Sequence, residues 1–93
     1  MVQISWTKKS LKDLKAINDY ISLDSTFYAK RFISKLIHRV DQLLEFPESG
    51  RVVPEKSEPG IRELIEGNYR IFYRLQKEKI TILRIHNAAR KIK

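Results

Sequence analysis

The chain has 93 residues, which is enough for one domain with a single hydrophobic core (residues 1–93) and too few for two. Lys and Arg outnumber Asp and Glu by 19 to 11, and the net charge of +8 favours an anionic partner, either nucleic acid or an acidic protein. Cysteine is absent, which excludes a disulfide framework and a thiolate metal site. Because the sequence also lacks an apolar signal segment and any run of about 18 apolar residues, we expect a cytoplasmic protein.

Residue patterns in the first half predict a strand followed by a hairpin of two helices. Residues 2–6 (VQISW) alternate apolar and polar side chains, as in a short strand with one buried face. Thr7 is suited to cap the first helix, and Asp24 or Ser25 the second, which ends before Pro47. The predicted apolar stripes are Leu11, Leu14, Ile17 and Ile21 in the first helix, and Tyr28, Phe32, Ile33, Leu36, Ile37, Val40, Leu43 and Leu44 in the second.

The second half predicts a loop and three strands. Residues 46–60 hold all three prolines and two of the three glycines, so they should form a loop, and long loops in compact domains are often functional. Strand-like runs follow at residues 61–66, 69–75 and 79–86, and Gly67-Asn68 is typical of a tight turn between the first two. The whole order predicts an α+β fold: an N-terminal strand, an α-helical hairpin, and a three-stranded antiparallel meander whose one face the helices cover.

The segment NYRIFYR, residues 68–74, concentrates arginines and aromatic rings in one strand. Successive side chains of a strand point to opposite faces, so Arg70, Phe72 and Arg74 share one face while Tyr69, Ile71 and Tyr73 share the other. The second set is typical of a core. The first set is either a solvated surface that keeps the sheet soluble or a surface for an anionic target.

Taken together, several segments resemble the RelE/ParE superfamily of bacterial toxins from toxin–antitoxin pairs. They are Trp6 at the end of the first strand, DLKAINDYI, FPESGRVVPE, IREL, GNYRIFYRL and the closing IHNAAR, which extend over nearly the entire chain. The resemblance implies a compact toxin with no metal or other cofactor, held silent by an antitoxin. It leaves two activities open, because RelE-like members cut messenger RNA in the ribosomal A site and ParE-like members poison DNA gyrase.

The nuclease alternative requires groups that move protons and cations that stabilise the phosphorane. The resemblance assigns such roles to Arg70 and Arg90, and His86 is the candidate proton-transfer group because imidazole titrates near neutral pH. Glu63 is a candidate carboxylate base. Its spacing from Ile61 and Ile65, which look like core residues, also predicts a different role, as the cross-strand partner of an arginine.

Further residues are expected to bind the anion, and some to be structural. The candidates for RNA or anion binding are Arg62, Arg74, Arg84, Tyr69 and Lys91. The chain departs from the RelE pattern, because Ile61 and Glu63 stand where relatives carry lysines and no tyrosine follows Arg90. His38 lies among packing residues of the second helix and is expected to be structural.

The antitoxin is predicted to be an acidic, partly disordered segment that folds along the second helix and the arginine-bearing face. Phe32, Lys35, Arg39 and Arg70 are the expected contacts. If the target is gyrase, the basic helix face with Lys30, Arg31, Lys35 and Arg39, together with the basic tail, would supply the docking surface. A third alternative is a degenerate module that binds only the antitoxin.

Overall fold

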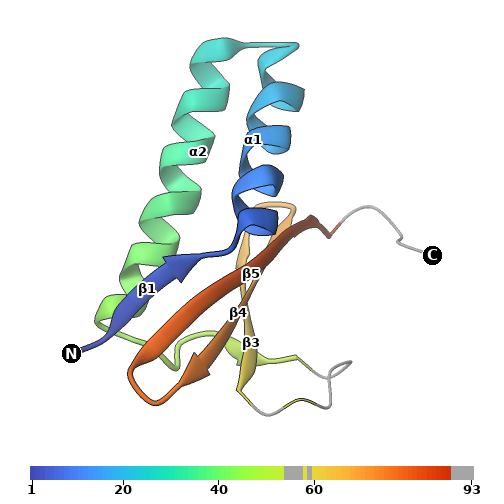
Figure 1. Cartoon of the computed structure of the whole chain (residues 1–93). Helices are drawn as coiled ribbons and strands as arrows, with labels where there is room; N and C mark the ends of the chain where they lie inside the picture. The colour runs from blue at the N-terminus through green and yellow to red at the C-terminus, as the bar shows by residue number, and fades with distance from the viewer. Residues whose placement is uncertain (54–57, 59, 89–93) are drawn as a thin grey trace.

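The computed structural model describes residues 1–53, 58 and 60–88 and has the predicted α+β order (Figure 1). Its elements are β1 (Gln3–Trp6), α1 (Lys8–Ser22), α2 (Thr26–Asp41), the 3-10 helix η1 (Gln42–Leu44), β2 (Arg51–Val52), β3 (Ile61–Glu66), β4 (Tyr69–Gln76) and β5 (Lys79–Asn87). The short strand β2 lies inside the segment predicted to be a loop. It was missed because two residues flanked by prolines and glycines carry no recognisable strand pattern.

The two helices begin at the predicted caps. The Thr7 hydroxyl accepts a hydrogen bond from the Ser10 amide at 3.0 Å, and the Ser25 hydroxyl accepts one from the Tyr28 amide at the same distance. Each bond satisfies a backbone N–H that has no partner within the first helical turn. In Figure 1 the helices stand side by side and extend beyond the sheet. None of the helices in the described part of the chain has the length and apolar character needed to cross a membrane.

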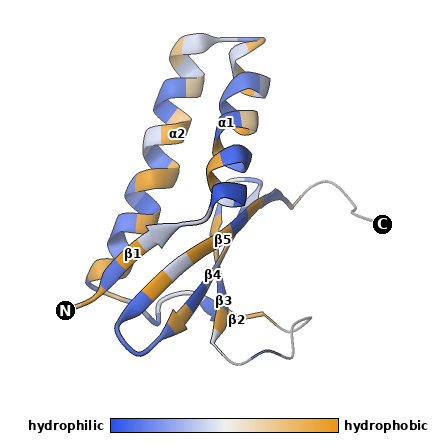
Figure 2. Ribbon diagram, in the orientation of Figure 1, coloured by the Kyte–Doolittle hydropathy of each residue, from blue (hydrophilic) through white to orange (hydrophobic). Residues whose placement is uncertain are grey.

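The five strands form one sheet in the order β1-β5-β4-β3-β2. Strands β3, β4 and β5 form the predicted antiparallel meander, β2 extends it antiparallel to β3, and β1 pairs with β5 in parallel. In the β1–β5 pairing Ile4 lies beside Ile80 and Trp6 beside Ile82, which continues the apolar surface toward the sheet edge. Figure 2 shows the resulting alternation of apolar and polar residues along β4 and β5.

The core lies between the helical hairpin and one face of the sheet. Its buried members are Ile17, Leu36, Val40, Leu43, Leu64, Ile71, Tyr73, Ile80, Ile82 and Ile85. Predictions that Leu11, Tyr28, Ile37 and Leu44 belong to the core were wrong, since these side chains are 51%, 60%, 38% and 50% exposed. His38 is exposed as well, so it is not a packing residue. The reason is geometric: the helices bury only a narrow stripe, and at the start of α2, where Tyr28 lies, the hairpin projects past the sheet (Figure 1).

The side-chain alternation of β3 differs from the expectation. Leu64 is buried against the helices, whereas Ile65, expected in the core, is 51% exposed. Gly67 adopts a φ of 58° in the two-residue turn, so Glu66 lies opposite Tyr69 and Leu64 opposite Ile71. The turn therefore fixes which β3 side chains face the helices, and Glu63 falls on the other side.

Candidate functional site

The candidate site lies on the outer face of the sheet, defined as the face that points away from the helices. Arg70 of β4 pairs with His86 of β5, and Phe72 of β4 pairs with Glu63 of β3 on one side and Arg84 of β5 on the other. Cross-strand partners point to the same face of a sheet. The register therefore brings the two expected site residues Arg70 and His86 side by side.

A buried carboxylate organises two arginines on this face. Glu63 is 1% exposed, and its two oxygens accept hydrogen bonds from Nε of Arg51 in β2 and Nε of Arg70 in β4. The predicted pairing of Glu63 with an arginine is confirmed. Since both carboxylate oxygens are occupied by guanidinium groups, Glu63 is poorly placed to remove a proton from a substrate.

An aromatic ring connects Arg70 to His86. The central carbon of the Arg70 guanidinium lies 4.9 Å from the centre of the Phe72 ring, in the range of a cation–π contact. The His86 ring meets Phe72 edge-on, with the ring centres 5.5 Å apart and an interplanar angle of 68°. Phe72 thus packs against both Arg70 and His86, which limits the rotamers available to the two side chains.

Arg84, expected to bind the anion, is already engaged within the protein. Its Nε and terminal nitrogen donate to the two carboxylate oxygens of Asp13 in α1 at 2.8 and 3.1 Å, and the Ile85 amide donates to the same carboxylate at 2.9 Å. Burial alone would raise the pKa of the Asp13 carboxyl. The hydrogen bonds from Arg84 and Ile85 outweigh that effect, so this pKa lies below its ordinary value. Asp13 therefore ties helix α1 to strand β5.

Other predicted site residues lie away from Arg70. Arg62 donates to the Gly50 carbonyl at 2.7 Å, and the Tyr69 ring packs against Phe32 with the ring centres 5.4 Å apart. Both side chains are on the helix side of the sheet, so neither lines the surface around Arg70. Arg74 lies on the outer face and pairs with Glu58 at 2.8 Å. Arg90 and Lys91 lie outside the described residues.

The expected antitoxin contacts on α2 are partly engaged as well. Lys35 and Arg39 lie 3.8 and 4.0 Å from the carboxylate of Glu66. Beside them runs a groove of about 650 Å³ on the outside of α2. Aromatic and basic side chains dominate its lining, which consists of Phe27, Tyr28, Arg31, Phe32, Ser34, Lys35 and His38. Phe27 and Tyr28 are 69% and 60% exposed, so this groove presents apolar surface beside positive charge.

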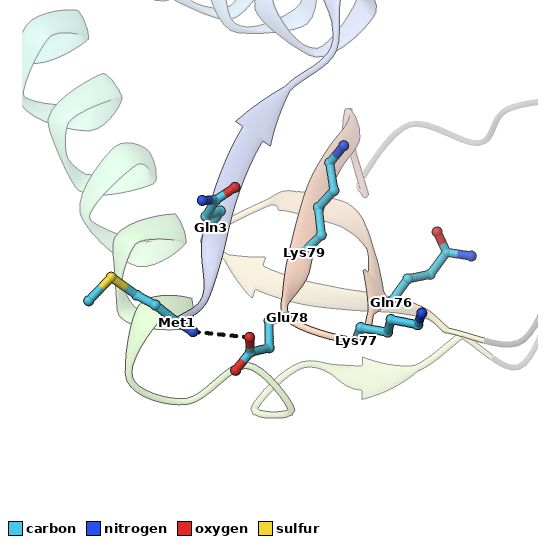
Figure 3. A pocket seen from close by; sticks show the side chains of 6 residues that line it. All are labelled: Met1, Gln3, Gln76, Lys77, Glu78 and Lys79. Carbon is cyan, nitrogen blue, oxygen red and sulfur yellow. Dashed lines mark ion pairs between the residues drawn. The ribbon is translucent and has the colours of Figure 1, made fainter.

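A second hollow, of about 600 Å³, lies at the turn between β4 and β5 (Figure 3). Its lining residues are Met1, Gln3, Gln76, Lys77, Glu78 and Lys79, and the N-terminal ammonium pairs with Glu78 at 3.0 Å. The turn is at the opposite end of the hairpin from Arg70 and His86. This hollow is therefore separate from the candidate site.

Two side chains of the outer face were not singled out by the sequence as site residues, namely Arg51 and Phe72. Arg51 was missed because its strand could not be recognised, and only the β2–β3 pairing brings it to Glu63. Phe72 shares the strand face of Arg70 and Arg74 in NYRIFYR, so its placement on the outer face was predicted. Its contacts with Arg70 and His86 depend on the strand register, which the sequence left open.

Comparisons with known proteins agree on the family. Residues 4–92 match the family model described as the ParE toxin of the type II toxin–antitoxin system parDE. Toxin RelE2 of Caulobacter vibrioides is 38% identical over 91 residues, which cover 97% of this chain and 99% of that protein. A chain of the chromosomal ParDE TA system from P. aeruginosa superposes with a TM-score of 0.77 at 30% identity, covering 94% of this chain and 96% of that one. A chain of the toxin–antitoxin complex RelBE2 from Mycobacterium tuberculosis shares the fold, with a TM-score of 0.67 at 18% identity over 92% of this chain and 96% of that one.

Proposed function

Because the chain belongs to the RelE/ParE superfamily of type II toxins, we propose that it arrests growth by cleaving messenger RNA on the ribosome. The observation that carries this proposal is the pairing of Arg70 with His86 on adjacent strands. The pairing provides a cation that is always charged beside an imidazole that can exchange protons near neutral pH.

In the proposed reaction the ribose 2′-hydroxyl attacks the neighbouring phosphorus, and the bond to the 5′-oxygen breaks. His86 accepts the hydroxyl proton, and Arg70 stabilises the extra negative charge on the phosphorane oxygens. The contacts of Arg70 with Glu63 and Phe72 support this role, because a guanidinium that is already oriented loses little freedom on binding phosphate. Glu63 acts by holding Arg70, and the leaving oxygen takes its proton from His86 or from the ribosomal environment.

A cognate antitoxin is the expected partner. The similar structures from P. aeruginosa and M. tuberculosis are described as a toxin–antitoxin system and a toxin–antitoxin complex. We propose that an acidic antitoxin segment covers Phe32, Lys35, Arg39 and Arg70. Lys35 and Arg39 already face Glu66, so an antitoxin carboxylate would have to compete with that side chain. A steep fall in affinity with salt would mean that the charges dominate, and a shallow one that apolar anchors such as Phe32 do.

Gyrase poisoning is the second candidate, and a different observation favours it. The family model that matches the chain describes ParE toxins, and a ParDE chain superposes with a TM-score of 0.77. Such a mechanism needs a docking surface and no proton-transfer group. The exposed aromatic and basic residues on the outside of α2 could supply that surface.

Expression from a tightly regulated promoter separates the candidates. Transcript 5′ ends and gyrase–DNA cleavage complexes would be mapped in the same cells for wild type, Arg70→Ala, His86→Ala and the control Lys12→Ala. New ends within codons that vanish in Arg70→Ala and His86→Ala but persist in Lys12→Ala would support RNA cleavage. Intact transcripts with trapped gyrase would refute it, and normal growth with neither signal would indicate a module that binds only the antitoxin.

A further inference from the structure

The outer face contains a charged group that RNA cleavage by Arg70 and His86 does not by itself require. Arg51 comes from the segment after α2, 12 residues before Glu63, and reaches the same buried carboxylate that holds Arg70. Three adjacent strands, β2, β3 and β4, each contribute one member of this Arg51–Glu63–Arg70 triad. Glu63 is fully buried, whereas Arg51 remains 61% exposed, so its side chain reaches both the carboxylate and the solvent.

The backbone around Arg51 is held firmly in place. The preceding residue, Gly50, donates its amide to the Tyr73 hydroxyl at 2.9 Å and accepts a hydrogen bond from Arg62 at 2.7 Å. Arg51 itself pairs with Glu63 in the β2–β3 ladder. Contacts from strands β3 and β4 thus position the start of β2, and the Arg51 side chain projects from a fixed point.

The charge pattern of the triad is unusual for a surface that should attract an anion. A buried carboxylate opposes the approach of any phosphate, so attraction alone would be served better by a neutral residue at position 63. Glu63 accepts a hydrogen bond from Nε of each arginine, so the carboxylate holds one edge of each planar guanidinium group. The carboxylate therefore weakens the attraction but fixes the direction of both guanidinium groups.

We propose that Arg51 and Arg70 form a two-arginine site for a backbone phosphate of single-stranded RNA, with Glu63 as the residue that positions them. The inference rests on the proposed function, since it assumes that RNA is the anion that this face binds. It adds Arg51 to the RNA-contacting residues and extends the positioning role of Glu63 from Arg70 to both arginines.

The test uses the fact that the two explanations of Glu63 predict opposite changes in RNA affinity for Glu63→Gln. A fluorescein-labelled oligo-uridylate with 2′-O-methyl groups, which cannot be cleaved, would be titrated with each variant and followed by anisotropy. If Glu63 only adds negative charge, Glu63→Gln should bind the oligonucleotide more tightly than wild type. Positioning predicts weaker binding, by about fivefold or more, despite the additional positive charge.

Variants of Arg51 provide a second measurement that does not require replacing a buried side chain. Arg51→Ala should weaken binding by about tenfold, and Arg51→Lys should recover only part of the loss because lysine keeps the charge without the planar fork. Lys12→Ala, which removes an exposed charge from α1, should change affinity far less. Thermal unfolding followed by circular dichroism would verify that each variant is folded, and if Glu63→Gln is not, the Arg51 series decides.

The outcomes separate this inference from the proposed function. Tighter binding by Glu63→Gln, or equal affinities of Arg51→Ala and Lys12→Ala, would overturn the two-arginine site while leaving RNA cleavage by Arg70 and His86 intact. A wild-type protein that traps gyrase and does not bind the oligonucleotide would overturn both. Loss of antitoxin affinity in Arg51→Ala with unchanged oligonucleotide affinity would reassign the triad to the antitoxin and also overturn the proposal.

Discussion

Removing one buried hydroxyl should destabilise the protein substantially. Tyr73 is fully buried, and its hydroxyl donates to the Pro47 carbonyl and accepts from the Gly50 amide, each at 2.9 Å. In Tyr73→Phe the Pro47 bond costs about 1 kcal/mol, and the buried Gly50 amide left unsatisfied costs about 1–3 kcal/mol. The expected loss in the free energy of unfolding is therefore roughly 2–4 kcal/mol. For a domain of this size that corresponds to a fall in Tm of roughly 10–30 °C.

Urea unfolding followed by the fluorescence of the single tryptophan, Trp6, would measure this loss. Tyr28→Phe is the matched control, since that ring is 60% exposed and should stay within about 0.5 kcal/mol of wild type. Burial raises the pKa of Tyr73 above its ordinary value of 10.0. The unfolded chain thus releases this proton first, so wild-type stability should fall as pH rises above about 10, and Tyr73→Phe should lack that component. An unchanged urea midpoint in Tyr73→Phe would refute the argument.

Three further predictions follow from other contacts. A Cβ at Gly50 would lie 2.5 Å from the Tyr73 hydroxyl oxygen, so Gly50→Ala should unfold at clearly lower urea than wild type. Leu36→Ala removes a fully buried side chain and should cost about 2–5 kcal/mol by urea unfolding, whereas Leu23→Ala, at an 82% exposed position, should cost little. The pKa of Asp13 is lowered in the folded protein, so wild-type stability should fall as pH drops below about 3.8. Asp13→Asn should be less stable at neutral pH and show a flatter acid limb in urea titrations at stepped pH.

The sequence alone was sufficient to predict the elements that have a strong hydrophobic period or a clear helix cap. Thr7 caps the first helix as predicted, and Ser25, one of the two candidates Asp24 and Ser25, caps the second, because a hydroxyl directly before an apolar helical stripe can accept a hydrogen bond from the first turn. The alternation in β4 correctly separated Ile71 and Tyr73 from Arg70, because one strand face is wholly apolar or aromatic.

The predictions were wrong where the pairing of strands, and not the local sequence pattern, decides which way a side chain points. Ile65 was expected in the core because it is apolar and shares a strand face with Ile61, yet the Gly67 turn directs Leu64 toward the helices instead. That turn was recognised from the sequence, so its two-residue length could have given the register of β3 against β4. Arg51 could not have been found in this way, since its two-residue strand exists only through its pairing with β3.

The net charge explains less of the candidate site than the composition suggests. Among the described residues, three arginines of the outer face, Arg51, Arg70 and Arg74, and Arg84, which reaches helix α1, are paired with three carboxylates, Glu63, Glu58 and Asp13. These pairs hold four positive and three negative charges, so they account for only one of the chain's eight excess positive charges. A target drawn only by the overall field would have little reason to prefer this face over the lysine-bearing helices. Specific anion binding here must therefore depend on where the guanidinium groups point, and Glu63 and Phe72 determine that direction for Arg70.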